Sequence, residues 1–460
     1  MKRIPGTQVL DRADPITVVG AGMAGLAAAT ALAETGQPVR VFEAAPRAGG
    51  RARSFDDARF GHVDNGQHLV MACYYEMLAF LRRIGVSDEK LGIQARLSVA
   101  MVEPGGARVG LHAPDLPAPL DLAAALARFR GASAPARARA LAFALALKSG
   151  WREPKTGERC APWLARNGQR GALSRALWHP LIWATLNEDP EYASAESLHQ
   201  VLYRAMFAEN ADPRLGFPRV GMSELYVDPA IEHLERHGAE LHFAAPVRSV
   251  HVEDGRVVGI VDREGKLHAS RRVIVAVPPH SAHRMMPDAY KRHAPFDALE
   301  RLGTSPIVNL WARVDRIPFD EAFVGLLDSP IHWLFARDRD AGVLTATISG
   351  AKELVEQSAD ALRHELEEAL RRYFPGRRVE VLAFRAIKEK HATIAQTPAT
   401  QARRPFPSTP IDGLWFAGDW VATGLPATLE SAAQSGHDAA TLALNHRSRG
   451  AAANESSARL

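Results

Sequence analysis

The chain has 460 residues, of which 47% are hydrophobic and 23% are charged. This balance is ordinary for a globular protein with a sizeable core and excludes a chain that is disordered throughout. The length predicts roughly two or three domains. Only Cys73 and Cys160 are present, which excludes a disulfide scaffold and a zinc site built from several cysteines. The net charge of +4 permits attraction to an anionic surface without indicating nucleic-acid binding.

The first strong pattern along the chain is a strand, a glycine-rich turn, a helix and a second strand. A β-branched run leads into Gly20-Ala-Gly22-Met-Ala-Gly25, which opens an alanine-rich helix, and a second β-branched run ends on Glu43. In this context Gly20 makes the tight turn, Gly22 lets the backbone approach a pyrophosphate, and Gly25 allows close packing of helix on strand. Glu43 can accept hydrogen bonds from ribose hydroxyls and would repel a 2′-phosphate. The unit therefore predicts a dinucleotide site and disfavours NADP.

A second glycine-bearing loop follows at 47–54 and contains Gly49, Gly50 and three arginines. The planar fork of arginine pairs two oxygens and suits a diphosphate. A solvated basic surface loop would have the same composition, so this loop alone leaves both interpretations open.

The rest of the chain alternates between helical and β-like stretches. Residues 86–216 are dominated by alanine- and arginine-rich stretches and are interpreted as a mainly helical insertion. Asp254-Gly255 between two alternating runs predicts a β-hairpin. The other expected elements are helices at 75–84, 352–373 and 426–445 and strands at 239–261, at 272–278, within 305–350 and near 414.

The two ends of the chain resemble the FAD-binding segments of the flavin amine oxidase and phytoene desaturase superfamily. The run from Val18 to Ser54 resembles the N-terminal segment. Leu414-Trp-Phe-Ala-Gly-Asp419, with the run from Gly424 to Ala432, resembles the C-terminal one. The resemblance implies an α/β fold, with a Rossmann-like doubly wound FAD-binding domain and an interleaved α+β substrate domain. The last helix would direct its N-terminus at the flavin ring, where negative charge develops on reduction.

The same resemblance implies how the chain is divided and which residues hold FAD. The FAD-binding domain would be discontinuous, and Gly418 and Asp419 would face the ribityl-phosphate portion. The implied ranges are 14–85, 217–285 and 405–447 for this domain, 86–216 and 286–404 for the substrate domain, and 448–460 for a flexible tail. The implied FAD contacts are Gly20, Gly22, Met23, Ala24, Gly25, Glu43, Ala44, Gly50, Arg51, Gly66, Gln67, Val247, Gly418, Asp419, Thr428 and Leu429.

Three further segments resemble one branch of this superfamily, the squalene-associated bacterial hydroxysqualene dehydroxylases of hopanoid pathways. These segments are Val63-Asp-Asn-Gly-Gln-His-Leu69, Leu181-Ile-Trp-Ala-Thr-Leu-Asn187 and Gly418-Asp-Trp-Val-Ala-Thr-Gly-Leu-Pro426. The resemblance implies an enzyme that removes the hydroxyl group of a hydrophobic C30 isoprenoid as water and replaces it with a hydride from reduced FAD. A carotenoid-type desaturase or an amine oxidase would move the hydride the other way. A non-catalytic FAD-binding accessory protein is the third alternative.

This reaction requires a proton donor, and His68 is the first candidate because histidine is the usual donor near neutral pH. A structural histidine bonded to a backbone carbonyl is the alternative. Asp64 and Asn65 would orient His68 or bind the alcohol, or they would only cap a turn. The histidines have no metal-ligand spacing, and no metal site is predicted.

Candidate substrate contacts lie in the branch-specific segments. Trp183, Thr185, Asn187 and Trp420 would line the isoprenoid site, where aromatic rings can face an allylic cation. Ordinary core packing accounts equally well for buried tryptophans.

A membrane surface is an expected partner because such a substrate resides in the bilayer. Residues 119–149 mix leucine and phenylalanine with arginine, which is typical either of an interfacial helix pair or of an ordinary amphipathic surface helix. No signal peptide and no transmembrane span are evident. We expect a cytoplasmic protein at the inner face of the membrane, functionally associated with squalene-pathway synthases.

Overall fold

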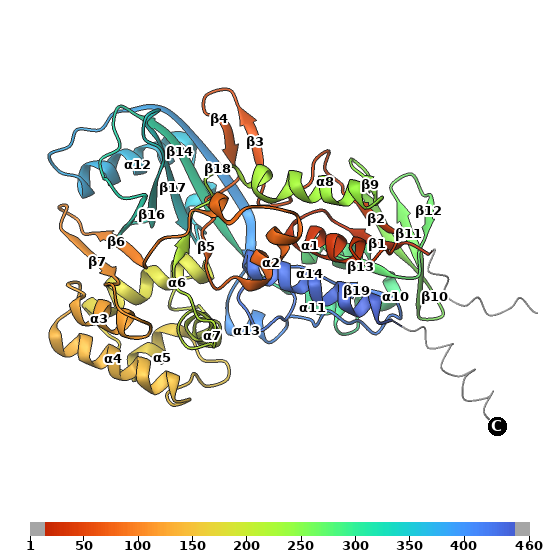
Figure 1. The fold of residues 1–460 in the computed structure, drawn as a ribbon, viewed down its shortest axis with the longest axis horizontal. Helices are drawn as coiled ribbons and strands as arrows, with labels where there is room; N and C mark the ends of the chain where they lie inside the picture. Colours follow the sequence, from red (N-terminus) through yellow and green to blue (C-terminus); the bar gives the residue numbers. More distant parts are fainter. Residues whose placement is uncertain (1–13, 447–460) are drawn as a thin grey trace, which may run out of the picture.

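The computed structural model describes residues 14–446, and a five-stranded parallel sheet organises one side of it (Figure 1). Its strand order is β19-β13-β1-β2-β9, so strands distant in the chain lie side by side. Val18, for example, is opposite both Val41 and Ile274. The strands are β1 (Ile16–Val19), β2 (Val39–Phe42), β9 (Glu240–His242), β13 (Val273–Val275) and β19 (Leu414–Phe416). This sheet confirms the predicted α/β class.

Helices cover one face of the parallel sheet, and a small β meander packs on the other. The central contact on the helical face joins α1 and α14, where a Cβ atom on Gly436 would come within 2.3 Å of the Ala24 carbonyl oxygen. The helical face is formed by α1 (Met23–Ala33), α2 (Tyr75–Arg83), α8 (Asp228–Arg236) and α14 (Leu429–Leu444). The other face is covered by β10 (Val247–Glu253), β11 (Arg256–Asp262), β12 (Leu267–Ala269), α9 (Pro279–Met285), α10 (Asp288–Lys291) and α11 (Phe296–Glu300).

The hairpin predicted at Asp254-Gly255 is confirmed. Asp254 and Gly255 have φ values of +47° and +76° and connect β10 to β11, as a tight two-residue turn requires.

A seven-stranded sheet organises the other side, in the order β18-β14-β17-β16-β15-β6-β7. All neighbouring strands are antiparallel except β15 and β6. The strands are β6 (Ser98–Val102), β7 (Arg108–His112), β14 (Thr304–Val314), β15 (Phe323–Leu326), β16 (Trp333–Asp338), β17 (Val343–Ser349) and β18 (Val381–Ile394). Helix α12 (Ala359–Tyr373) packs on one face, and a group of helices packs on the other.

The interpretation of residues 86–216 as mainly helical is incomplete. Its first part forms the β6–β7 hairpin, which turns at Gly105 and Gly106 and extends the large sheet. Helices α3 (Leu120–Arg128), α4 (Ala134–Lys148), α5 (Cys160–Arg166), α6 (His179–Leu186) and α7 (Ala195–Met206) then follow. The remaining elements are β3 (Ser54–Asp57), β4 (Gly61–Asp64), β5 (Val70–Met71), β8 (Leu215–Gly216) and α13 (Pro398–Gln401).

Two predicted helices begin later than expected because side-chain caps define their first residues. Ser358 accepts a hydrogen bond from the Ala361 amide, so α12 starts at Ala359, and Thr428 does the same for α14 through Ser431. Among residues 14–446 no helix has the length and apolarity needed to cross a membrane. The domain ranges stay a prediction, and the predicted tail at 448–460 lies outside the described residues.

Candidate active site

In the first glycine loop, two of the three motif glycines pack closely against backbone atoms, and the third has free space beside it. Gly20 has a φ of +104°, and a Cβ there would lie 2.5 Å from the Ala276 carbonyl oxygen on the neighbouring strand. A Cβ on Gly25 would lie 1.8 Å from the Gly20 carbonyl oxygen. The nearest atom to a Cβ on Gly22 is the Gly50 Cα at 3.9 Å. The open position therefore faces the second glycine loop, at the N-terminus of α1.

The second glycine loop is fixed against the first by its backbone. The Gly49 amide donates to the Ala21 carbonyl oxygen at 2.8 Å. Gly50 has a φ of +57°, and a Cβ there would lie 3.2 Å from the Gly22 Cα. A side chain at either Gly22 or Gly50 would fill the space between the loops, so both glycines keep a cradle open for a pyrophosphate.

Glu43 lies at the end of β2, beside this cradle. Its two carboxylate oxygens accept hydrogen bonds from the Ala21 and Ala45 amides, both at 2.8 Å. Val247, the first residue of β10, lines the same end of the cavity together with Ala44. These are the positions predicted for the ribose and adenine contacts.

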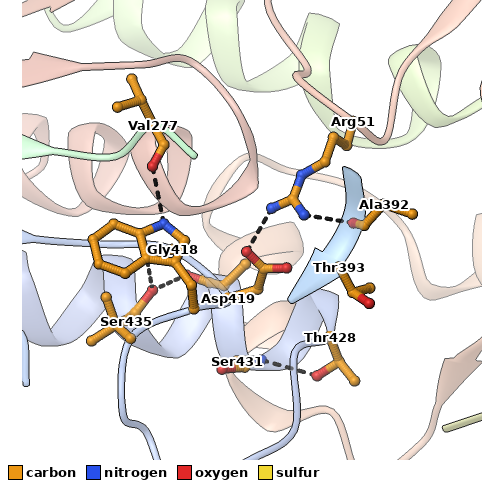
Figure 2. A network of polar contacts seen from close by, with 12 residues as sticks. Arg51, Val277, Ala392, Thr393, Gly418, Asp419, Thr428, Ser431 and Ser435 are labelled. Carbon is orange, nitrogen blue, oxygen red and sulfur yellow. Dashed lines mark hydrogen bonds and ion pairs between the residues drawn. The ribbon is translucent and has the colours of Figure 1, made fainter. Parts of the chain in front are cut away.

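Arg51 joins the second glycine loop to the C-terminal flavin segment (Figure 2). Its Nη2 lies 2.5 Å from Asp419 Oδ1, and its Nη1 donates to the Ala392 carbonyl oxygen at 2.6 Å. Burial lowers the pKa of Arg51, but the nearby acidic groups, chiefly the Asp419 carboxylate with a contribution from Glu389, together raise it above its ordinary value, so the guanidinium stays charged.

The loop between β19 and α14 is held by a buried arginine that the sequence analysis missed. Arg404 Nη2 donates to the backbone oxygens of Asp419 and Val421, at 2.9 Å and 2.5 Å. Burial lowers the pKa of Arg404 to about 10, which still leaves it charged at neutral pH. The amide of Gly418 donates to Ser435 Oγ at 2.8 Å (Figure 2). No spacing or motif distinguishes Arg404 from its exposed neighbour Arg403.

Trp420 belongs to the flavin-side wall of the cavity. It is 1% exposed, its Nε1 donates to the Val277 carbonyl oxygen at 2.9 Å, and its ring packs against Phe416. Trp420 and Val277 both line the cavity. Trp420 is also part of the core around the parallel sheet, and its contact with substrate stays a prediction.

One continuous cavity of about 960 Å³ runs from the glycine loops into the second half of the molecule. Every predicted FAD contact except Gly25 lines it; Gly25 instead lets α1 pack on β1. Beyond the flavin segments the walls become apolar and reach α3 and α4. These walls include Leu97, Val99, Met101, Leu122, Leu126, Phe129, Leu141, Ala144, Leu177, Trp183, Phe323, Trp333 and Phe335.

The residues of the predicted catalytic segment differ in placement: some line the cavity, and one is buried in the protein interior. Asn65, Gln67 and His68 line the cavity, whereas Asp64 does not. The Asp64 carboxylate accepts from Ser54 Oγ and the Met222 amide, and it pairs with Arg337 Nη2 at 3.1 Å. Asp64 is therefore held by protein contacts in the interior, and its catalytic role stays a prediction.

His68 lies beside the cavity in an environment that disfavours its charged form. Burial and the nearby Arg337 lower the pKa of His68, while Asp64 opposes them only partly. Its Nε2 is enclosed and has no hydrogen-bond partner among the described residues. A neutral imidazole can contact a substrate hydroxyl, but it is a poor acid at neutral pH.

A small cluster of polar side chains, Asn65, Asn309 and Glu389, interrupts the apolar walls where they meet the glycine loops. Asn65 Nδ2 donates to the Arg51 carbonyl oxygen at 3.1 Å and lies 3.4 Å from Glu389 Oε2. Asn309 Nδ2 reaches the Asn65 carbonyl oxygen at 3.4 Å, and Asn309 Oδ1 accepts from Thr347 Oγ1 at 3.0 Å. Of these residues only Asn65 was predicted from the sequence, since Asn309 and Glu389 lie in ordinary strand patterns.

The segment at 181–187 supplies an aromatic side chain to the cavity wall and hydrogen bonds that connect α6 to the large sheet. The Trp183 ring lines the cavity and stacks on His332, with centroids 4.6 Å apart. Thr185 Oγ1 donates to the Leu181 carbonyl oxygen at 2.7 Å within its own helix. Asn187 donates to Ser305 and Thr393 and accepts from the Gly350 amide. Its side-chain amide joins α6 to the large sheet, and Asn187 also lines the cavity, so its contact with substrate stays a prediction.

Comparison with known proteins agrees with this geometry. The model of the flavin-containing amine oxidoreductases matches residues 23–444, and the chain belongs to that family. The chain is also 32% identical to the hydroxysqualene dehydroxylase of Rhodopseudomonas palustris, over 93% of this chain and 98% of that protein. The corresponding enzyme of Sinorhizobium fredii is 30% identical, over 94% and 98%. Within the larger family, the chain is therefore a member of the hydroxysqualene dehydroxylases, and it is an FAD-dependent oxidoreductase.

A solved structure supports the fold. The oxidoreductase of Methanosarcina mazei superposes with a TM-score of 0.72 at 18% identity, covering 92% of this chain and 99% of that one. The open cradle at Gly22 and Gly50, the acid at the end of β2 and the N-terminus of α14 fit FAD.

Replacing the buried arginine is expected to weaken cofactor binding. Arg404→Gln removes a charge that bonds four backbone carbonyl oxygens, those of Asp419, Trp420, Val421 and Leu425. Loss of this charge leaves them unsatisfied, at about 1–3 kcal/mol for each buried group. We expect purified Arg404→Gln to retain less than half of the wild-type flavin absorbance per protein. Arg403→Gln, at an exposed position, is the matched control. Equal flavin content in both variants would contradict the assigned role.

The histidine behind Trp183 predicts a loss of stability in acid. Burial lowers the pKa of His332 to about 4. The unfolded chain binds this proton near pH 6.5, so stability is retained above that pH and is lost as the pH falls toward 4. The loss is at most about 3 kcal/mol. His332→Phe should flatten the dependence of the melting temperature on pH in this range. The exposed His364→Gln serves as control, and an unchanged slope in His332→Phe would refute the prediction.

Proposed function

We propose that this chain reduces hydroxysqualene to squalene, with loss of water and uptake of a hydride. One observation carries this proposal: the FAD cradle and a long apolar compartment form one continuous cavity, with a small polar group at their junction. A long hydrocarbon with a single hydroxyl group near its centre needs both features. The names of the relatives supply the particular alcohol.

The chain's own residues bind the substrate, exclude water and hold its hydroxyl group. The apolar walls displace water from the hydrocarbon, which stabilises binding by about 25 cal/mol for each Å² removed from water. Trp183 and Trp333 line the cavity with aromatic rings, which suit an allylic cation. Asn65, His68 and Asn309 line the cavity and supply polar atoms that can contact the hydroxyl group. When bound, FAD supplies the hydride.

The alternatives make different demands on the same cavity. A desaturase transfers hydride from its substrate to oxidised flavin. That substrate has no hydroxyl group, so the polar side chains in the cavity would have nothing to bind. An amine oxidase usually holds its amine between two aromatic rings beside the flavin, whereas Thr428 and Leu429 line the cavity at the start of α14. A non-catalytic FAD protein predicts that the bound flavin never reacts.

A reoxidation experiment tests this function directly. The flavin of the purified protein is reduced under anaerobic conditions, and hydroxysqualene is added. We expect the oxidised flavin absorbance to return and one squalene to form for each flavin reoxidised. Squalene added instead should leave the flavin reduced. No return of absorbance and no squalene with hydroxysqualene would exclude the proposal, and reduction of oxidised flavin by squalene would favour a desaturase.

We further propose that the protein draws this substrate from a membrane surface at α3 and α4. Leu120 and Leu145 line the cavity and are 57% and 67% exposed, which makes the gap between the two helices an apolar entrance. Trp151 is 73% exposed shortly after α4. Lys148 also lines this entrance, and Arg128 ends α3. Apolar side chains flanked by cations suit an anionic bilayer. The cytoplasmic face of the membrane and an association with squalene-pathway synthases remain part of this proposal.

Acidic substitutions at the entrance should weaken membrane binding. Leu120→Asp with Leu145→Asp removes two inserted side chains and adds negative charge. We expect at least about a tenfold loss of affinity for phosphatidylglycerol vesicles in a sedimentation assay, because each change costs more than about 1 kcal/mol. Leu382→Asp is the matched control, since Leu382 is 56% exposed but lies on β18. Equal binding by both proteins would contradict the proposed entrance.

A further inference from the structure

Three carboxyl groups line the cavity within residues 14–446, and two of them have close protein partners. The Glu43 oxygens accept backbone amides, and Asp419 is paired with Arg51. The third, Glu389, has the Asn65 amide at 3.4 Å as its hydrogen-bond partner. Glu389 is therefore the least engaged of these three cavity carboxylates.

Glu389 lies where the apolar compartment meets the flavin loops. It is on β18, opposite Ile307 of β14, and both residues line the cavity. Three residues further along, the Ala392 carbonyl oxygen binds Arg51. One strand thus carries both the carboxylate and the contact to the second glycine loop.

The charged groups around Glu389 leave its carboxylate available. Arg51, from the second glycine loop, attracts it electrostatically but has its own partner in Asp419. On β18 itself, Lys388 Nζ donates to the Gln357 carbonyl oxygen, and Lys390 pairs with Glu356 at 2.7 Å. From the segment after β4, Asn65 and His68 line the same cavity, and the residue opposite on β14 is the uncharged Ile307.

We propose that Glu389, held by the Asn65 amide, is the proton donor to the departing hydroxyl group. The proposal rests on the proposed function. In this step the carbon–oxygen bond breaks, the oxygen takes the Glu389 proton and leaves as water, and the carbon receives a hydride from reduced flavin. The carbon gains two electrons and the flavin loses two. The Glu389 carboxylate then regains a proton from solvent when the product leaves.

The apolar substrate itself supplies the condition that a carboxylic acid needs. When the hydrocarbon fills the cavity it displaces water from around Glu389, and desolvation penalises the charged carboxylate. The Asn65 amide lies 3.4 Å from Glu389 Oε2, and Asn309 Nδ2 reaches the Asn65 carbonyl oxygen, so the carboxyl group lies beside the polar residues of the cavity.

Two variants and a control test this assignment. Glu389→Gln keeps the size and the hydrogen-bonding capacity of the side chain but has no acidic proton, and we expect kcat to fall by about a hundredfold or more. Flavin content and the affinity for hydroxysqualene, measured by quenching of tryptophan fluorescence, should change by less than about threefold. Glu389→Asp should recover part of the rate. The control is Glu356→Gln, whose side chain is 67% exposed.

The pH profile separates a proton donor from a merely structural side chain. Wild-type kcat should decline as the pH rises and the acid is lost, and this decline should be absent in Glu389→Gln and shifted in Glu389→Asp. Wild-type kcat from Glu389→Gln, or a residual rate with the same decline, would overturn the assignment. A wild-type protein that makes no squalene would instead overturn the proposed function. If Glu389→Gln does not fold, a Glu389→Asp protein with an unshifted profile would also exclude Glu389 as the donor.

Discussion

The ion pair between Arg51 and Asp419 joins segments 368 residues apart, and the cavity depends on it. Arg51 leaves the second glycine loop, whose backbone forms the cradle with Gly22, and Asp419 follows β19. A partly buried arginine and a buried aspartate are each costly without a partner, but together they fix the distance between the two ends of the chain. Because Arg51 also binds the Ala392 carbonyl oxygen, the same guanidinium ties β18 of the large sheet to the flavin loops.

The polarity of the cavity follows from this arrangement. Near the glycine loops, backbone amides, Glu43 and the N-terminus of α14 present a polar surface suited to a dinucleotide. Toward α3 and α4 the lining is mainly leucine, alanine and phenylalanine, with Lys148 at the entrance. Near the flavin loops, Asn65 bonds Arg51 and Glu389, while Asn309 bonds Thr347 and the Asn65 carbonyl oxygen. These side chains offer a ligand hydroxyl polar partners beside the flavin loops, which favours one position for a long hydrocarbon.

The sequence predicted the flavin half of this arrangement well because its constraints are local. Gly20, Gly25 and Gly50 are required by backbone contacts within a few residues of a strand end, and such requirements leave a readable spacing. The hairpin at Asp254-Gly255 is equally local. The β6–β7 hairpin was not predicted, since its strands are stabilised by pairing with β15, more than two hundred residues away. Arg404 and Glu389 have no local signature, because long-range contacts alone decide their roles.

Several predicted site residues also bond the protein itself. Asp64, Asn187 and Trp420 were predicted because they occur in segments that resemble a family, and each has hydrogen-bond partners within the protein. Their roles toward substrate stay predictions. A polar residue in a distinctive segment can be needed to shape the cavity without facing it. Asp64 holds the segment that presents Asn65 and His68, and Asn187 holds the helix that presents Trp183. Asn65 and His68 follow β4, whereas Asn309 and Glu389 lie on paired strands, whose position is set by the pairing of β14 with β18. A group held in this way keeps its distance from the flavin loops while the apolar walls adapt to the substrate.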